Sequence, residues 1–476
     1  MTLLHDTAAA LPELLLATTA LLLIVTARLW RHPRPAAAAA AGGVVAAAWA
    51  LLAQPAGGAA LFDGMLVRTP WIALLQVGIL GVLLLVILMT LGTTTLREDL
   101  PEFFGLLLLS GAGLLLVTGA QSLLMVYVGL ELVSLTSYLL TGFLRREAVS
   151  AEAGLKYFLV GTLATAMLLY GVSWVYGAAG TLDLSALAAA LADGTHLNHS
   201  LLVVGALLVL AGLAFKVGLV PFHAWAPDAY EGAPTAVAAF VSAGPKLAGF
   251  ALLVRVLGLA FRGLTPIWAD ALEVVAILTM TLGNVAALRQ TNVKRLLAYS
   301  SIAQAGYIVI GVVAAGPAGA FAVTYYALVY VLMNLAAFCC VIAVANATGR
   351  EDLGAYAGLA QTHPVLAAGF ALALLSLAGI PPLAGFLAKV WIFAAALQSD
   401  RVLLAVVAAV NSVIAVFYYA LLLKQMYLSP PPPTGAHADS PWPLRLALGA
   451  SLAGVVLLGL WPTPLLTAIL AALPMP

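Results

Sequence analysis

Charged residues are scarce in this chain. Asp, Glu, Lys and Arg make up 8% of its 476 residues, whereas an ordinary globular protein contains roughly 25%. Lys plus Arg is 20 and Asp plus Glu is 19, and neither sign forms a run, so the sequence predicts no nucleic-acid-binding surface and no acidic tail. The same shortage of charge excludes the set of soluble domains that this length would otherwise suggest.

Cysteine and cofactor motifs are also lacking. The two cysteines, Cys339 and Cys340, are adjacent within an apolar run, and this spacing suits neither a disulfide framework nor a metal site. We interpret them as small buried hydrophobic residues. The sequence contains no GxxxxGK[ST] loop, no GxGxxG after a strand, no CxxC and no HExxH. We therefore expect no metal, nucleotide, flavin, iron–sulfur cluster or haem on this chain.

Long apolar runs dominate instead, because hydrophobic residues make up 64% of the chain. A membrane-spanning helix needs about 20 mostly apolar residues. The runs are uninterrupted, unlike the alternating segments of a membrane barrel, and helices satisfy their own backbone groups in lipid. The sequence therefore predicts an all-α, multi-pass membrane protein with about fourteen spans, at 11–30, 36–53, 71–91, 103–120, 122–143, 155–178, 201–225, 233–260, 268–288, 296–315, 318–345, 364–398, 402–428 and 444–462.

The loop charges predict an orientation. The first apolar run could pass for a secretory signal, but Arg28, Arg31 and Arg34 follow it and no cation precedes it, so we expect a retained span. With that loop in the cytoplasm, twelve loop cations lie on the cytoplasmic side and four outside, which predicts both termini outside. The high alanine content and the absence of a transit peptide favour the inner (plasma) membrane of a bacterium. Residues 429–443 are proline-rich and predict a linker.

Most of the lysine lies inside predicted spans. Of six lysines, four are placed there: Lys156, Lys216, Lys246 and Lys389. A charge at the bilayer centre costs at least ~2.5–3.5 kcal/mol, so such residues are functional candidates by default. Lysine readily exchanges its proton when buried, whereas arginine stays charged.

Three of these lysines stand beside an interruption of their helix. The interruptions are Pro221 near Lys216, Gly244–Pro245 before Lys246, and Pro382 before Lys389. A proline inside a helix removes a backbone hydrogen bond and clashes with the preceding turn. Such breaks are tolerated in membranes where they are buried in protein or line a wet cavity. The pattern favours a proton path over a chance distribution of lysines.

Glu131 lies near the middle of the fifth span, in GLELVSLTSY. One interpretation is a structural ion pair between two helices; the other is a carboxylate of a proton relay. Burial disfavours the charged form of a lysine, and a nearby carboxylate opposes that effect. Movement of Glu131 relative to Lys216 would then switch the lysine between holding and releasing its proton, as one coupled unit.

Other polar positions have two interpretations each. Lys156, at the start of its span, could extend to the membrane surface or join the relay. His223, just past the Pro221 break, could be a satisfied core residue or a relay group. In NVKRLLAYSSIAQAGY, Tyr299 and Gln304 could hold a water chain or simply hydrogen-bond between helices.

Three stretches resemble a known family. The segments KVGLVPFHAWAPDAYEGAPTAVAAFVSAGPK, NVKRLLAYSSIAQAGY and GIPPLAGFLAKVWIF resemble the antiporter-like membrane subunits of respiratory complex I (NADH:quinone oxidoreductase), over about residues 131–427. Among these, the chain is most similar to subunit N, because Lys389 stands where subunit M has glutamate and subunit L is longer. The Mrp-type sodium/proton antiporters contain a related membrane subunit that shares much of the pattern. Many relatives have histidine at the position of Gln304. Glutamine can form hydrogen bonds there but cannot titrate.

The resemblance implies a fold and a path. It implies two five-helix repeats of inverted topology, each with a broken helix, and divides the chain into 1–102 (the first three spans), 103–262 (the first repeat), 263–428 (the second repeat) and 429–476 (the proline-rich loop and last helix). Within it, Glu131 and Lys216 would form a gating pair, Lys246 the central link, and Lys389 the last donor toward the outside.

The resemblance also implies partners. They would be the lipid bilayer and other complex I membrane subunits, including further antiporter-like ones. NADH, FMN, iron–sulfur clusters and quinone would all belong to partner subunits. We therefore expect a proton-translocating subunit of an NADH:quinone oxidoreductase that performs no redox chemistry itself. The alternatives are a subunit of an Mrp-type antiporter and a structural membrane scaffold without its own proton path.

Overall fold

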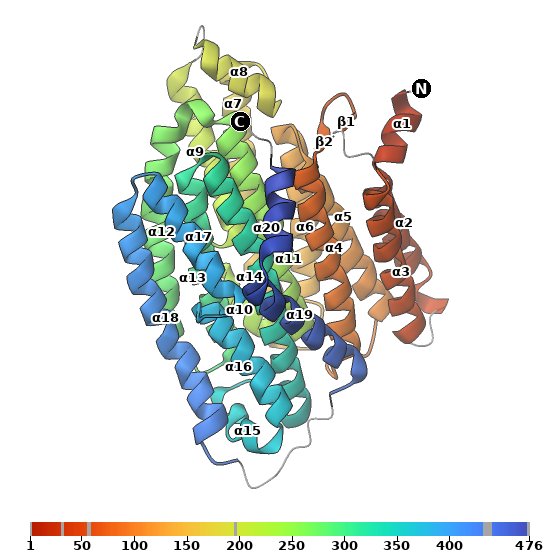
Figure 1. Cartoon of the computed structure of the whole chain (residues 1–476). Coiled ribbons are helices and arrows are strands. Elements are labelled where there is room, and N and C mark those ends of the chain that lie inside the picture. Colours follow the sequence, from red (N-terminus) through yellow and green to blue (C-terminus); the bar gives the residue numbers. More distant parts are fainter. Residues whose placement is uncertain (1, 30–32, 55–58, 195–197, 432–439, 474–476) are drawn as a thin grey trace.

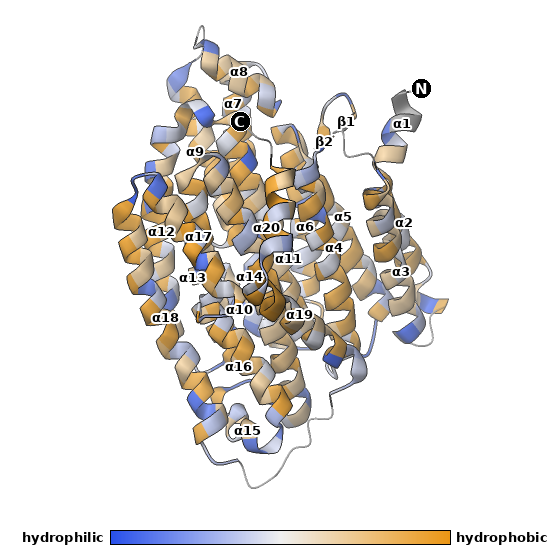
Figure 2. Ribbon diagram, in the orientation of Figure 1, coloured by the Kyte–Doolittle hydropathy of each residue, from blue (hydrophilic) through white to orange (hydrophobic). Residues whose placement is uncertain are grey.

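The structure is a bundle of helices that run roughly side by side (Figure 1). It is a computed structural model that describes residues 2–29, 33–54, 59–194, 198–431 and 440–473. Arg31 and most of the predicted proline-rich linker, 432–439, lie outside these residues. Hydrophobic residues cover the length of the helices, and hydrophilic residues gather toward the two ends of the bundle (Figure 2).

Twelve helices in the described part of the chain are long and apolar enough to cross a membrane. They are α3 (Pro33–Leu52), α4 (Pro70–Leu91), α5 (Leu100–Gly119), α6 (Leu123–Thr141), α7 (Ala148–Ala179), α9 (His199–Val217), α11 (Thr235–Arg255), α12 (Thr265–Ala287), α13 (Val293–Ala314), α14 (Gly316–Thr348), α18 (Val402–Leu428) and α19 (Trp442–Leu460). The two remaining predicted spans contain α2 (Leu11–Val25) and the pair α16 (Pro364–Ala378) and α17 (Ala384–Gln398). The prediction of a helical, multi-pass membrane bundle is therefore confirmed, with twelve of the about fourteen predicted spans present in the described residues as helices of full length. The side of the membrane on which the termini lie stays a prediction.

Shorter elements decorate the bundle, and the sequence analysis did not predict them. They are α1 (Thr2–Ala9), the antiparallel hairpin β1 (Ala59–Leu61) and β2 (Leu66–Arg68), α8 (Leu184–Asp193), α10 (Trp225–Gly232), α15 (Leu359–Thr362) and α20 (Thr463–Ala472). Figure 1 places α8, the hairpin and both chain ends at one end of the bundle, here called the α8 end. The opposite end, which carries α15, is called the α15 end.

The start of α6 is tied to the chain just before α8. Ser122 caps α6 by accepting a hydrogen bond from Met125 N. Beside it, Leu123 N donates to Leu182 O at 2.9 Å, and Leu184 N donates to Gln121 O at 2.8 Å. These bonds satisfy backbone groups at a helix start that would otherwise have no intrahelical partner. We call this pair of bonds the α8-end strap.

The start of α13 is tied to the chain just before α15 in the same way. Val293 N donates to Glu351 O at 2.8 Å, and Leu353 N donates to Thr291 O at 2.9 Å. This is the α15-end strap. Burial acts against the charged carboxylate of Asp352 in it, but hydrogen bonds from Arg350 outweigh that effect and hold the pKa of Asp352 below its ordinary value. Because the two straps lie at opposite ends of the bundle, the α6 and α13 regions are related by inversion, as the resemblance implies.

Two helices are broken in the same manner. α9 ends at Gly218 (φ +78°) and α16 ends at Gly379 (φ +86°), a left-handed conformation that glycine adopts without strain. Each glycine and the residue after it donate back to the last turn, which satisfies carbonyls at the helix end. α10 and α17 then continue beyond Pro221 and Pro382. The predicted breaks at Pro221 and Pro382 are confirmed. The predicted break at Gly244–Pro245 is wrong, because α11 continues as one helix through Pro245 and past Lys246. The domain limits drawn from the resemblance stay a prediction.

Candidate functional site

Four lysines of the described chain are buried: Lys294, near the start of α13, pairs with Glu351 at 2.9 Å, and the other three lie on three different helices. Lys216 lies on α9 and is 3% exposed, Lys246 on α11 is 1% exposed, and Lys389 on α17 is 5% exposed. Lys216 donates to a hydroxyl, Lys246 to a hydroxyl and a carbonyl, and Lys389 to a carbonyl. A buried cation needs such partners, because the loss of its hydration costs far more than the loss of apolar contacts.

Lys216 contacts α6 one helical turn from Glu131, at Ser134, whose hydroxyl donates to Leu130 O at 2.6 Å. Lys216 Nζ donates to Ser134 Oγ at 2.8 Å, and Ser134 lies three residues after Glu131 on α6. Glu131 Oε1 accepts instead from Thr165 Oγ1 of α7 at 2.7 Å. In the described chain the two charges form no direct ion pair, but Glu131 lies close enough to act electrostatically on Lys216. The predicted pair therefore lies on adjoining turns of the α6–α9 contact, with each side chain bonded to a different hydroxyl.

Lys246 lies at the break of α9. The space that a Cβ would fill on Gly218 is 3.8 Å from Lys246 Nζ, so the ammonium sits against the interrupted backbone. Its acceptors are both on Ser301 of α13, the carbonyl at 2.7 Å and the hydroxyl at 2.5 Å. The same hydroxyl contacts Tyr230 Oη at 3.2 Å and accepts from Tyr330 Oη at 2.8 Å. Ser301 thus connects Lys246 to tyrosines on α10 and α14.

Gln304 continues the polar line one turn farther along α13. Its Oε1 accepts from Tyr326 Oη at 2.5 Å, and its Nε2 donates to Leu377 O at 2.9 Å. Leu377 is in the last turn of α16, where carbonyls lack intrahelical donors. Gln304 therefore reaches the second break, and the neighbouring Tyr299 does not, since it is only partly buried and packs among apolar side chains.

Lys389 folds back onto the end of the helix before it. Its Nζ donates to Ala378 O at 2.8 Å and lies 4.8 Å from the ring centroid of Tyr307. The C-terminal end of a helix carries partial negative charge, and an aromatic face attracts a cation. Both features favour the charged form of Lys389. No carboxylate of the described chain pairs with it.

Two of the other candidate residues lie outside this line. The side chain of Lys156 is 47% exposed and pairs with Glu152 at 2.8 Å and Asp228 at 2.9 Å. Asp228 also pairs with Arg295 at 2.7 Å, so Lys156 belongs to a group of ion pairs between α7, α10 and α13. His223 lies in the α9 break and is half-buried, and its Nδ1 has no hydrogen-bond partner among the described residues.

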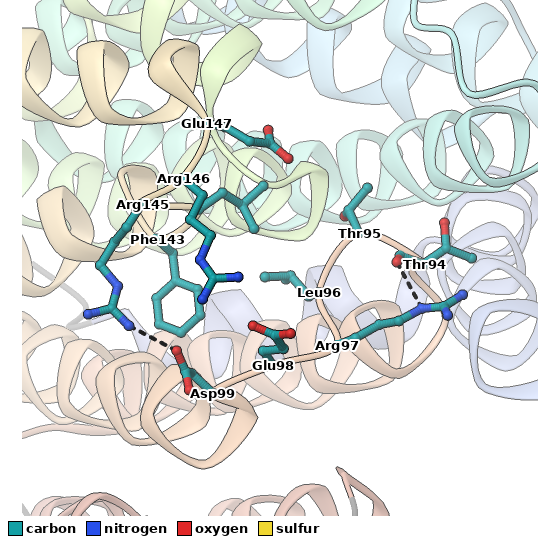
Figure 3. A pocket seen from close by; sticks show the side chains of 11 residues that line it. Thr94, Thr95, Leu96, Arg97, Glu98, Asp99, Phe143, Arg145, Arg146 and Glu147 are labelled. Carbon is teal, nitrogen blue, oxygen red and sulfur yellow. Dashed lines mark hydrogen bonds and ion pairs between the residues drawn. The ribbon is translucent and has the colours of Figure 1, made fainter.

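A charged cavity at the α15 end is separate from the lysines. It encloses about 280 Å³ between the α4–α5 and α6–α7 loops. Figure 3 shows Arg145 bonded to Asp99 across it, with Arg97, Glu98 and Arg146 nearby. Positive and negative side chains line this cavity in equal number. None of the residues predicted for the proton path lies in its wall. In the described chain, no group of three or more His, Cys, Asp or Glu side chains is placed to hold a metal ion.

The hydroxyl groups of the line were missed by sequence reasoning. Ser134, Thr165, Tyr230, Tyr326 and Tyr330 each contact a candidate residue or its serine partner. Two weak signals were present: Ser134 follows Glu131 by one helical turn, and Tyr326 and Tyr330 are four apart on one face of α14. Neither signal separates a relay hydroxyl from the many Ser, Thr and Tyr side chains that only join helices.

Comparisons with known proteins point in one direction. The profile of the NADH:quinone oxidoreductase/Mrp antiporter transmembrane family matches residues 120–415. The chain is 47% identical to NAD(P)H-quinone oxidoreductase subunit 2 of Synechococcus elongatus over 316 residues, which are 66% of this chain and 60% of that protein. The matched part thus spans about three fifths of that relative's length.

Solved structures resemble the whole bundle. A chain of respiratory complex I from Thermus thermophilus with bound aureothin has a TM-score of 0.81 and 32% identity, covering 96% of this chain and 99% of that one. A chain of the Mrp complex from Dietzia sp. DQ12-45-1b has a TM-score of 0.87 and 25% identity, covering 99% and 97%. With buried lysines at paired helix breaks and a family profile that covers more than half of its length, the chain belongs to the NADH:quinone oxidoreductase/Mrp antiporter transmembrane family.

Proposed function

We propose that the chain is a proton-translocating membrane subunit of an NADH:quinone oxidoreductase. The observation that carries the proposal is the line of buried, proton-exchanging groups from Glu131 to Lys389, joined by hydroxyls and interrupted helix ends. Buried charges are costly, and Lys216, Lys246 and Lys389 have no carboxylate partner in the described chain, unlike the buried pairs Arg68–Glu13 and Lys294–Glu351. The relatives named as subunits of NAD(P)H-quinone oxidoreductase and of complex I support the coupling to quinone reduction in partner subunits.

The first step concerns Glu131, Ser134 and Lys216. A hydroxyl both donates and accepts hydrogen bonds, so Ser134 can take part in proton transfer to and from Lys216 when its hydroxyl turns away from Leu130 O. When Glu131 lies near, its negative charge favours the protonated lysine; when it moves away, burial favours the neutral amine. A displacement of α6 relative to α9 would then load and release one proton. The hydrogen bond to Thr165 fixes one of these two positions of Glu131.

The later steps use two acceptors of different kinds. Lys246 receives the proton at the α9 break and is held by Ser301, which also contacts two tyrosine hydroxyls. The amide of Gln304 does not titrate and cannot hold the proton. Water molecules must therefore carry the proton past Gln304 toward Lys389. Lys389 holds its proton against Ala378 O and Tyr307. We assign it as the last donor before the outside.

The exposed face of α6 indicates a partner subunit. Leu124, Val128, Leu135 and Leu139 are each at least 43% exposed, and Glu131, which is partly exposed, lies among them with helical spacing. A carboxylate half open to lipid would be expensive. We infer that another membrane subunit of the complex covers this face and completes the surroundings of Glu131. The membrane would be a bacterial inner membrane, or a photosynthetic membrane if the host has one.

The test is proton pumping by membrane vesicles that carry Lys216→Ala. We expect NADH-driven acidification to fall at least about tenfold, as for the loss of a positioned acid–base group, while the amount of assembled complex stays near wild type. Lys424→Ala, at an exposed lysine of α18, is the matched control and should pump normally. Equal pumping and equal quinone reduction by Lys216→Ala and wild type would leave the structural scaffold as the better account.

The likeness to the Mrp complex of Dietzia favours one alternative, a cation/proton antiporter subunit. The two functions differ in their driving force. Vesicles given a sodium gradient and no NADH would change internal pH if the antiporter function holds. In the proposed function, internal pH changes only while NADH is oxidised.

A further inference from the structure

A second cavity opens at the α8 end, where the two repeats meet. It encloses about 340 Å³ between the turn that joins α11 to α12, the turn that joins α13 to α14, the first turn of α4 and the end of α20. Its lining is mainly apolar and includes Trp71, Val254, Leu259, Trp268, Val312 and Ala320. None of the lysines or carboxylates of the proposed proton path lines it.

Arg262 stands at the rim of this cavity without a partner. It is exposed, and its guanidinium makes no hydrogen bond or ion pair within the described residues. The other three arginines at this end are bonded: Arg68 to Glu13, Arg255 to Gln121 and Thr118 O, and Arg401 to Asp270 and Glu273. The rim of this cavity therefore holds a cation that is available to a ligand.

The tryptophans offer only their apolar rings to the cavity. Trp71 Nε1 already donates to Thr324 Oγ1 at 2.9 Å, and Trp268 Nε1 already donates to Phe261 O at 2.9 Å. Both lie in the first turn of helices that begin at the α8 end, and Trp gathers at such depths where a membrane meets water. The cavity thus combines an apolar interior with one cation at the membrane surface.

We propose that this cavity binds one phospholipid, with its phosphate on Arg262 and an acyl chain between Trp71 and Trp268. A guanidinium binds phosphate with two parallel hydrogen bonds, and the apolar lining suits a hydrocarbon chain. The site therefore prefers lipids with a net negative head group. A neighbouring apolar cavity of about 460 Å³, between α3, α4 and α20, contains Arg68, but Glu13 and Gln54 already occupy that arginine. That cavity should show no such preference.

The test uses the full chain in its complex, reconstituted in phosphatidylcholine vesicles that contain a few per cent of brominated phosphatidylglycerol. Bromine on the acyl chain quenches nearby tryptophan, and the difference between wild type and Trp268→Phe isolates the cavity signal. We expect saturable quenching of Trp268 at low mole fraction. Arg262→Gln should need about tenfold more of the anionic lipid for half-maximal quenching, since one charge-assisted contact is lost. Arg97→Gln, at the α15 end, should behave as wild type.

A second variant keeps the proposal testable if Arg262→Gln assembles poorly. Gly258 is exposed at the mouth and has open space where a side chain would begin, so Gly258→Phe should fill the cavity and abolish saturation with the arginine intact. Gly81→Phe, which also enters open space, is its control. Quenching that rises in proportion to the bulk lipid in wild type, with no change in Arg262→Gln or Gly258→Phe, would mean that only bulk lipid touches this surface and would overturn the proposal. Proton pumping plays no part in the readout.

Discussion

The helix break after α9 and the helix break after α16 are each contacted by a side chain of a neighbouring helix, from α6 and α13 respectively, but the two contacts differ in chemistry. Ser134 lies eleven residues after Leu123, the first residue of α6. Gln304 lies eleven residues after Val293, the first residue of α13. Ser134 accepts from Lys216, two residues before Gly218, whereas Gln304 donates to the carbonyl of Leu377, two residues before Gly379. One backbone arrangement therefore holds an exchangeable proton in the first repeat and a fixed amide–carbonyl bond in the second.

The residues after the breaks differ as well. Seven residues beyond Pro221 stands Asp228, which pairs with Lys156 and Arg295. Seven residues beyond Pro382 stands Lys389, which turns back onto Ala378. The first repeat thus places its cation before the break and near a carboxylate, and the second places its cation after the break against carbonyls. The two breaks thus supply equivalent positions that carry different residues, and in the proposed function this difference gives the proton path its direction.

The largest expected effect comes from removing the carboxylate of the first repeat. In Glu131→Gln the amide oxygen can still accept from Thr165, so the helices should pack as before. The substitution removes the negative charge of Glu131 near Lys216, and Lys216 then has no carboxylate nearby, as is already the case for Lys389 in the second repeat. We expect protons pumped per NADH oxidised to fall at least about tenfold, measured in vesicles at matched amounts of complex.

Glu98→Gln provides the control for that experiment, because Glu98 is an exposed carboxylate of the α4–α5 loop. It should leave pumping unchanged. If Glu131→Gln pumps as well as wild type, the contrast between the two breaks has no functional meaning, and Glu131 serves only to join α6 to α7.

The middle effect compares Ser134→Ala with Gln304→Met. Loss of Ser134 removes the only hydrogen bond that Lys216 makes in the described chain, and a buried donor left without a partner costs about 1–3 kcal/mol. Pumping should fall severalfold, and Ser134→Thr should restore it. Gln304→Met keeps the side-chain length and also leaves a buried donor, the Tyr326 hydroxyl, without its acceptor. It removes no contact with a titrating cation, however, so pumping should change less than twofold. Equal losses in the two variants would show that both positions act only through packing.

Sequence reasoning went far with this chain for a physical reason. In lipid, a buried lysine is costly, and a broken helix is tolerated only where it is buried in protein or lines a wet cavity. Lys216 beside Pro221 and Lys389 after Pro382 therefore carry information that they would lack in a soluble protein. Hydroxyl groups are cheap in a membrane bundle, so Ser134 and the tyrosines gave no comparable signal. The acceptors of Lys246 and Lys389 include backbone carbonyls, whose positions depend on packing between distant helices and have no sequence pattern.

The hairpin and the straps were missed for a related reason. A strap consists of two backbone hydrogen bonds between segments about 60 residues apart, and any residue except proline can donate one. The capping residues Ser122 and Asn292 are ordinary helix-start signals and do not reveal what lies beside them. The inverted arrangement was expected only from the resemblance, and the straps are what make it visible in this chain.

The smallest expected effect concerns these caps. Asn292 Oδ1 accepts from Lys294 N at 2.8 Å and Arg295 N at 3.1 Å, whereas Ser122 Oγ accepts only from Met125 N at 3.2 Å. Removing a cap costs ~1 kcal/mol on average, so Asn292→Ala should lower the free energy of unfolding by more than Ser122→Ala. Thermal unfolding of the purified complex in detergent measures the difference, and Asn292→Asp and Ser122→Thr, which keep an acceptor, should be close to wild type. A larger loss from Ser122→Ala would mean that the α8-end strap bears more of the bundle's stability than its longer, single capping bond indicates.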